Sequence, residues 1–242
     1  MPVIDATLKR TFGFDEFKLG QRQVIETILA GKSAASIFPT GAGKSLCYQL
    51  PAVLEQGMTL VISPLLSLMK NQIDFLKSKN ILAAKLDSGM SAEDYRSTLE
   101  LARLGQLKIL MIAVERFKNE RFRTQLRQMN VSLLVVDEAH CISEWGHNFR
   151  PDYLKIPLYQ KEFRIKKVLL LTATATPKVI GDMCKKFIVS RENVVQTGFY
   201  RKNLFLRIRP VAEEKKRCTA AEGIGRKAGR PDNCVCYTAK DS

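Results

Sequence analysis

The chain has 242 residues, of which 45% are hydrophobic and 26% charged, a composition typical of a globular protein and unlike a disordered or collagen-like chain. Its longest unbroken apolar run, residues 109–114, is far shorter than the roughly 20 residues that a membrane-spanning helix needs. The 39 Lys and Arg residues outnumber the 24 Asp and Glu residues, and the resulting net charge of +15 favours nucleic acid as a partner.

Five short apolar runs rich in β-branched residues alternate with amphipathic stretches that are long enough for crossover helices. This alternation predicts βαβ units, and uniformly apolar runs are typical of parallel strands that helices cover on both faces. The fold class is therefore α/β, with a mostly parallel sheet flanked by helices and ligands bound beyond the carboxyl ends of the strands. The predicted strands are residues 34–38, 59–63, 108–113, 133–136 and 167–171, and the predicted helices are residues 20–29, 44–54, 65–77, 92–103 and 178–186.

The first predicted strand runs into a glycine-rich segment, Phe-Pro-Thr-Gly-Ala-Gly-Lys-Ser, at residues 38–45. Glycines allow backbone N–H groups to surround phosphates, and the start of the next helix adds a positive dipole end. Lys44 can reach the terminal phosphates of a nucleotide, and Ser45 can ligate Mg²⁺. The strict phosphate-loop pattern has glycine where this chain has Phe38, and a glycine turn before an ordinary helix is the alternative. The predicted nucleotide-binding residues here are Thr40, Gly41, Ala42, Gly43, Lys44 and Ser45.

Asp137 and Glu138 directly follow the fourth predicted strand. In phosphate-loop enzymes, a carboxylate at the end of a buried strand holds Mg²⁺, and a neighbouring carboxylate can orient and deprotonate the attacking water. Two acids after a strand indicate little alone, because acidic turn residues are common. Together with the phosphate loop they predict nucleotide hydrolysis, with Lys44, Asp137 and Glu138 as catalytic residues and Ser45 and Asp137 as magnesium ligands.

Residues 137–153, DEAHCISEWGHNFRPDY, resemble the RecQ family of DNA helicases in superfamily 2, and other segments extend the resemblance to about residues 10–210. Residues 12–21, FGFDEFKLGQ, are similar to the family's adenine-binding motif, residues 63–72, SPLLSLMKNQ, to motif Ia, and residues 171–176, LTATAT, to motif III. The resemblance implies a RecA-like domain of an ATP-dependent 3′-to-5′ DNA helicase that acts in DNA repair and recombination with ATP and Mg²⁺. An RNA helicase is disfavoured by the segment HCISEWGHNFRP.

The resemblance also assigns the adenine-binding residues. It makes Gln21 the residue that recognises adenine, a role that suits an amide because it donates and accepts hydrogen bonds at once. Phe14 would stack on the base. Lys18 stands where the family usually has Arg, and an ammonium lacks the planar group that stacks over a ring. Val114 and Asn148 likewise stand where the family usually has Pro and Asp.

Trp145, the only tryptophan of the chain, lies among polar residues shortly after the two acids. Aromatic rings stack on unpaired bases and guanidinium groups clamp phosphates, and the resemblance implies that this loop senses single-stranded DNA and couples its binding to hydrolysis. The alternative is that Trp145 and Phe149 fill a core beneath the loop. The predicted DNA-binding residues of the loop are Trp145, His147, Phe149 and Arg150.

The only two histidines, His140 and His147, have no Cys or carboxylate at metal-ligand spacing. His140 is therefore predicted to hydrogen-bond to Thr172 or Thr174 across the site and to relay the state of the nucleotide. The alternative is an interior imidazole whose hydrogen bonds are simply satisfied.

The composition changes near Pro210, where a charged run gives way to a stretch rich in Gly, Ala and basic residues. We expect a first RecA-like ATP-binding domain at residues 1–210, a linker at 211–233, and the start of a second, absent helicase domain at 234–242. As an amino-terminal motor half, the chain would not unwind DNA unless a partner supplies the second motor domain. The alternative is a non-catalytic fragment that binds ATP or nucleic acid without productive turnover.

No secretory signal is visible in the first twenty residues, and the six cysteines lack the spacing of a disulfide framework. These features predict a cytoplasmic protein without membrane association, located with the nucleoid in a bacterium or in the nucleus of a eukaryote. The expected partner is single-stranded or tailed duplex DNA.

Overall fold

The computed structural model describes residues 2–87, 89–145 and 149–198. The chain divides into a compact unit, Met1–Gly198, and a second unit, Phe199–Ser242, so every described residue belongs to the first unit. The predicted domain boundary at residue 210, the linker and the start of a second domain lie outside the described residues. His147 and Asn148 also lie outside them.

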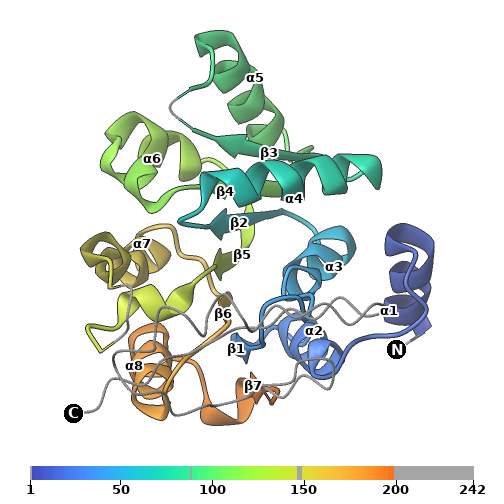
Figure 1. The fold of residues 1–242 in the computed structure, drawn as a ribbon. Helices are drawn as coiled ribbons and strands as arrows, with labels where there is room; N and C mark the ends of the chain where they lie inside the picture. The colour runs from blue at the N-terminus through green and yellow to red at the C-terminus, as the bar shows by residue number, and fades with distance from the viewer. Residues whose placement is uncertain (1, 88, 146–148, 199–242) are drawn as a thin grey trace, which may run out of the picture. The chain divides into compact units, whose positions relative to one another are not determined.

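The described residues contain one seven-stranded sheet, in which every strand pair is parallel and the order is β3-β4-β2-β5-β6-β1-β7 (Figure 1). The α/β fold class with a parallel sheet is confirmed, as are the five predicted strands. The sequence did not predict β3 and β7, the two edge strands. The strands are β1 (Ala34–Ile37), β2 (Met58–Ile62), β3 (Ala83–Leu86), β4 (Ile109–Ile112), β5 (Val131–Val136), β6 (Val168–Thr172) and β7 (Val194–Gln196).

All five predicted helices are present, with boundaries within two residues of the prediction: α2 (Gln21–Leu29), α3 (Leu46–Leu54), α4 (Leu66–Ser78), α5 (Ala92–Arg103) and α8 (Pro177–Phe187). The unpredicted helical segments are short: α1 (Pro2–Thr7), η1 (Leu8–Phe12), η2 (Val114–Lys118), α6 (Glu120–Leu126), η3 (Ala139–Ile142), η4 (Pro151–Lys155), α7 (Ile156–Glu162) and η5 (Arg191–Asn193). In the described part of the chain, no helix has the length and apolar character needed to cross a membrane.

Helices cover both faces of the sheet and enclose two separate cores (Figure 1). On one face, side chains such as Leu134 and Leu170 pack with those of α5, α6, α7 and α8. On the other face, Val135 and Leu169 pack with side chains of α1, η1, α2, α3 and α4. Because successive strand residues point to opposite faces, both sets must be apolar, which explains the unbroken apolar runs. Burial of each such side chain stabilises the fold by roughly 1.5–3 kcal/mol.

The register of the sheet aligns the carboxyl ends of its central strands. Ile62 at the end of β2 pairs with Val136 at the end of β5, and Ile37 at the end of β1 pairs with Thr172 at the end of β6. The segments that follow these four strands therefore start at the same edge of the sheet.

Candidate functional site

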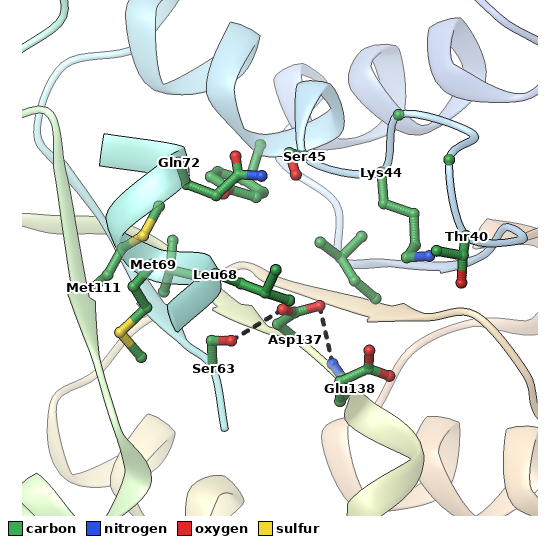
Figure 2. A pocket seen from close by; sticks show the side chains of 15 residues that line it. Thr40, Lys44, Ser45, Ser63, Leu68, Met69, Gln72, Met111, Asp137 and Glu138 are labelled. Carbon is green, nitrogen blue, oxygen red and sulfur yellow. Dashed lines mark hydrogen bonds between the residues drawn. The ribbon is translucent and has the colours of Figure 1, made fainter. Parts of the chain in front are cut away.

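The phosphate loop and the two acids line one pocket at the carboxyl edge of the sheet. The pocket has a volume of about 350 Å³. Figure 2 shows Thr40 and Lys44 from the loop after β1 opposite Asp137 and Glu138 from the segment after β5. The polar side chains that line it are Thr40, Lys44, Ser45, Tyr48, Ser63, Gln72, Asp137 and Glu138. The structure thus brings together the predicted catalytic residues and the predicted magnesium ligands.

The phosphate loop curls because two of its residues have a left-handed backbone. Gly41 has a φ of 83° and Gly43 a φ of 76°, a region that residues with a Cβ rarely adopt. Lys44 Nζ donates a hydrogen bond to the carbonyl oxygen of Phe38 at 2.9 Å, which closes the loop on itself. Ser45 precedes the first residue of α3, so the loop ends at the N-terminus of a helix, as phosphate binding requires.

Phe38, which departs from the general phosphate-loop pattern, has a structural role. Its ring is fully buried in the core on the α2 side of the sheet. A Cβ at Gly20 would lie only 2.8 Å from this ring, and Gly20 has a φ of 81°. The Phe38 ring therefore packs directly against the backbone at the start of α2, while its main-chain carbonyl oxygen accepts the hydrogen bond from Lys44.

Gln21, the predicted adenine-recognising residue, uses both ends of its amide within the protein. Its Oε1 accepts a hydrogen bond from the backbone N–H of Lys18 at 2.8 Å. Its Nε2 donates to the carbonyl oxygens of Gly43 at 2.9 Å and Ala42 at 3.2 Å. The side chain is 2% exposed. Gln21 thus holds the phosphate loop in place, and recognition of adenine requires that it exchange some of these hydrogen bonds.

A second cavity of about 280 Å³ lies beside the phosphate loop and is lined by Phe14, Lys18 and Gln21 together with Gly43 and Phe75. Phe14 is 46% exposed, so its ring is available for a planar ligand. Lys18 Nζ donates to the carbonyl oxygen of Gly41 at 3.1 Å. The structure therefore places the three residues of the predicted adenine site around one cavity next to the phosphate site.

Asp137 is held firmly at the end of β5. Its Oδ2 accepts a hydrogen bond from Ser63 Oγ at 3.1 Å, and its Oδ1 accepts one from the backbone N–H of Glu138 at 3.0 Å (Figure 2). Burial and the neighbouring Glu138 charge raise the pKa of Asp137, against the opposing effect of these hydrogen bonds. Ser63, the first residue of the motif Ia segment, was not predicted as a site residue, because only the sheet register brings it to Asp137. Tyr153, which donates to the Asp137 carbonyl oxygen at 3.3 Å, was also missed, because only the packing of η4 brings it to Asp137.

Glu138 has an unusual backbone conformation for a residue with a side chain. Its φ of 49° and ψ of 44° lie in the left-handed region, at a cost of roughly 1–2 kcal/mol. Its carboxylate Oε2 lies 3.3 Å from His140 Nδ1, and this contact with His140 lowers the pKa of Glu138 despite partial burial. Glu138 is therefore ionised at neutral pH and is positioned as a hydrogen-bond acceptor beside the pocket.

His140 makes the predicted hydrogen bond across the site. Its Nδ1 lies 2.8 Å from Thr172 Oγ1, and Thr172 Oγ1 in turn donates to the carbonyl oxygen of Thr174 at 3.0 Å. Contacts with the Cys141 sulfur and the Glu138 carboxylate raise the pKa of His140 to about 9. A protonated His140 donates to Thr172 and stays close to Glu138. The segment after β5 is therefore joined to the end of β6 by a hydrogen bond that adjoins the ion pair between His140 and Glu138.

The residues present fit a magnesium ion that is held jointly by protein and nucleotide. Mg²⁺ takes oxygen ligands and is commonly bound by one or two protein groups together with substrate phosphates and water. Ser45 and Asp137 supply a hydroxyl and a carboxylate in the same pocket. Within the described residues, no group of three or more His, Cys, Asp and Glu side chains is placed to hold a metal ion without such help.

Trp145 does not fill a core, so that alternative is wrong for this residue. The side chain is 64% exposed, and Lys178 Nζ lies 3.1 Å from the centroid of its ring. Phe149 and Arg150 are half-buried, and the backbone N–H of Arg150 donates to the carbonyl oxygen of Cys141 at 2.9 Å. His147, the fourth predicted residue of this loop, lies outside the described residues.

A basic pocket of about 480 Å³, which the sequence did not predict, follows β3 and β4 at the same edge of the sheet. Arg96, Arg116 and Arg121 line it, and the Arg116 guanidinium lies 5.5 Å from the centroid of the Tyr95 ring. Its one carboxylate, Asp87, forms an ion pair with Lys85. No single motif marks these residues, because they come from three separate segments of the chain.

Comparisons with known proteins identify the family to which the chain is similar. The sequence pattern of the DEAD/DEAH box helicase family matches residues 18–183. The chain is 43% identical over 203 residues to the ATP-dependent DNA helicase RecQ of Bacillus subtilis (strain 168), which covers 83% of this chain and 34% of that protein. It is 37% identical over 241 residues to the probable ATP-dependent DNA helicase RecS of the same organism, which covers 99% of this chain and 48% of that protein. The chain thus spans about a third to a half of the length of these relatives.

The solved structures show the fold. A hypothetical ATP-dependent RNA helicase from Sulfolobus tokodaii superposes with a TM-score of 0.62 at 21% sequence identity, over 93% of this chain and 66% of that chain. This likeness confirms the RecA-like arrangement of strands and helices.

Proposed function

The chain belongs to the DEAD/DEAH box helicase family, and we propose from this premise that it is the ATP-hydrolysing motor domain of a RecQ-type 3′-to-5′ DNA helicase of DNA repair and recombination. The observation that carries the proposal is the single pocket lined by Lys44, Ser45, Asp137 and Glu138. These four residues have the side chains needed for phosphate binding, magnesium binding and activation of water.

In this proposal each residue of the pocket has a separate task. Lys44 leaves the Phe38 carbonyl and donates to the terminal phosphates of ATP. Ser45 and Asp137 hold Mg²⁺, which supplies neutralisation of phosphate charge when bound. Glu138, already ionised beside His140, accepts a proton from the attacking water. The Phe14 ring and the Gln21 amide bind adenine in the neighbouring cavity.

Single-stranded or tailed duplex DNA is the proposed partner. The net charge of +15 favours a polyanion, and the arginine-lined pocket after β3 and β4 offers guanidinium groups for phosphates. The exposed ring of Trp145 offers a stacking surface for an unpaired base. With this substrate, the chain is expected to work with the nucleoid of a bacterium or in the nucleus of a eukaryote.

A DNA-stimulated phosphate-release assay with the Glu138→Gln variant tests the proposal. The variant keeps the size of the side chain and removes its basicity, so we expect MgATP binding to remain and DNA-stimulated hydrolysis to fall by about 10²–10⁴-fold. Glu144→Gln, a change at an exposed carboxylate of the same segment, is the matched control and should leave hydrolysis unchanged. Lys44→Ala should lose nucleotide binding itself.

Two outcomes would contradict the proposal. Hydrolysis by Glu138→Gln at the wild-type rate would remove Glu138 from the chemistry. Equal or stronger stimulation by RNA than by DNA would contradict the assignment of DNA as the substrate. DNA affinity should also fall steeply with salt, because each contacted phosphate releases counterions.

A further inference from the structure

The Trp145 ring is covered by a cation of the same chain. Lys178 Nζ lies 3.1 Å from the ring centroid, over the face of the indole. Both residues are exposed, so the contact is formed at the surface, in reach of solutes. One face of the indole on which a base could stack is therefore occupied by an ammonium group.

The contact joins two segments that start at the nucleotide pocket. Trp145 follows Asp137 and Glu138 through η3, and its backbone N–H donates to Ser143 Oγ at 3.3 Å. Lys178 is the second residue of α8, which begins directly after the segment that follows β6. The Thr176 hydroxyl accepts from the backbone N–H of Val179 at 3.4 Å and fixes the start of this helix.

The same two segments are linked a second time, in the interior. The hydrogen bond between His140 and Thr172 joins them next to Glu138, and α8 packs against η3. The contact between Lys178 and Trp145 and the hydrogen bond between His140 and Thr172 thus connect neighbouring parts of the chain, the first at the exposed indole and the second next to Glu138.

We infer that Lys178 is a positioning residue for nucleic-acid binding, whose ammonium group holds the Trp145 ring until an unpaired base replaces it. The inference rests on the proposed binding of single-stranded DNA through Trp145. A cation on an exposed ring is held more weakly than a stacked base, so the exchange is favourable. The displaced ammonium group then contacts the phosphate of the same nucleotide, which neutralises its charge.

This exchange requires both a base and a phosphate. Every base has a flat face, so no sequence preference is expected. An abasic strand presents the phosphates alone, so it can attract Lys178 but cannot occupy the ring. The ratio between the affinities for a thymidine oligonucleotide and for an abasic strand of equal length therefore measures the stacking step.

Tryptophan fluorescence of the 242-residue chain tests the inference, because Trp145 is the only tryptophan. The thymidine strand should change the emission of the wild-type chain, and the abasic strand, which cannot stack on the ring, should change it less. In Lys178→Ala the ring is free, so the affinity ratio should rise by about 2–5-fold, the size of an exposed cation–ring contact. Affinity for the abasic strand should fall.

Two further variants separate the ring contact from the charge. Lys185→Ala removes the same charge from an exposed position of α8, about two helical turns further on, and should leave the affinity ratio unchanged. Lys178→Arg keeps a cation over the ring and should restore the wild-type ratio. In the DNA-free chain, acrylamide should quench Trp145 more strongly in Lys178→Ala than in Lys185→Ala.

Three results would overturn the inference, and they are distinguishable from failure of the proposed function. Binding of the thymidine strand without a change in emission overturns the exchange while leaving DNA binding intact. Equal affinity ratios in wild type, Lys178→Ala and Lys185→Ala overturn the role of Lys178. Equal acrylamide quenching in the two alanine variants overturns the resting contact, whether or not DNA binds. Failure of the wild-type chain to bind either strand overturns the proposed function and the exchange together.

Discussion

Gln21 lies about twenty positions before the phosphate loop, yet its hydrogen bonds hold the conformation of that loop. Its Nε2 is held by the carbonyl oxygens of Ala42 and Gly43, and a Cβ added at Gly43 would lie 2.5 Å from that nitrogen. A Cβ at Gly41 would meet nothing within 4 Å, although its φ of 83° is similarly strained for alanine. The two glycines therefore form a matched pair.

We predict that Gly43→Ala destabilises the chain more than Gly41→Ala. Both variants incur left-handed strain of roughly 1–2 kcal/mol, and Gly43→Ala additionally breaks Gln21 hydrogen bonds worth roughly 0.5–1.5 kcal/mol each. Urea denaturation of both variants measures the difference. In a double-mutant cycle, Gln21→Ala should remove the extra cost, and additive effects of Gly43→Ala and Gln21→Ala would refute the explanation.

His140 makes the free energy of unfolding of the nucleotide-free chain depend on pH. Its folded-state pKa is raised to about 9, from an ordinary value of 6.5, so protonation of His140 stabilises the folded state. This contribution is fully present below pH 6.5 and is lost as the pH rises towards 9. We predict that the free energy of unfolding declines over this range in the wild-type chain and declines less in His140→Gln.

Urea denaturation at several pH values between 6.5 and 9 checks this prediction. All other titrating groups are common to both proteins, so the difference between their curves isolates His140. Parallel curves for the two proteins would show that the imidazole has an ordinary pKa in the folded chain.

At the scale of single elements, α8 ends at a residue that is poorly suited to its conformation. Ile188 has a φ of 56° and a ψ of 46° at the C-cap, and its side chain is 80% exposed. A β-branched residue in the left-handed region costs about 1–2 kcal/mol, whereas glycine adopts this conformation readily at helix ends.

Ile188→Gly is therefore predicted to raise the free energy of unfolding by about 1 kcal/mol. Leu158→Gly, at a similarly exposed position inside α7, should lower it by roughly the same amount, because glycine weakens a helix interior. Thermal denaturation of both variants provides the measurement. A lower melting temperature for Ile188→Gly would mean that the exposed isoleucine makes a stabilising contact.

The elements that could be predicted from the sequence are those with a strong periodic or apolar pattern. The five central strands are buried on both faces and read as unbroken apolar runs, so they were found. The strand β3 (Ala83–Leu86) contains alanines and Lys85 and lies at the sheet edge, and β7 (Val194–Gln196) has three residues, so neither gives a distinctive pattern. Helices α6 and α7 have seven residues each, too few for clear helical periodicity.

The residues of the candidate site likewise divide into those that the sequence could predict and those that it could not. Lys44, Ser45, Asp137 and Glu138 were predictable because each belongs to a contiguous motif next to a predicted strand. The hydrogen bond from Ser63 to Asp137 depends on the pairing of β2 with β5, which no local pattern specifies. The contact between Lys178 and Trp145 depends on how α8 packs against η3, and the arginine pocket on how α5 lies beside η2 and α6.

At the scale of the whole molecule, the residues that line the phosphate pocket limit the rate at which the 242-residue polypeptide can hydrolyse ATP alone. All its described lining residues come from one RecA-like unit, and none of them is an arginine. An arginine that stabilises charge on the transferred phosphate contributes roughly 10³–10⁵-fold to turnover in phosphate-loop enzymes.

We therefore predict that the isolated polypeptide binds MgATP and single-stranded DNA, hydrolyses ATP slowly, and does not separate the strands of a tailed duplex. Because no described residue of the pocket supplies such an arginine, unwinding should appear only when a second motor domain provides one. Strand displacement measured with a purified monomeric sample, beside ATP binding on the same sample, checks the prediction. Unwinding by that monomer would show that one RecA-like unit suffices here, and that a residue outside the described pocket completes the site.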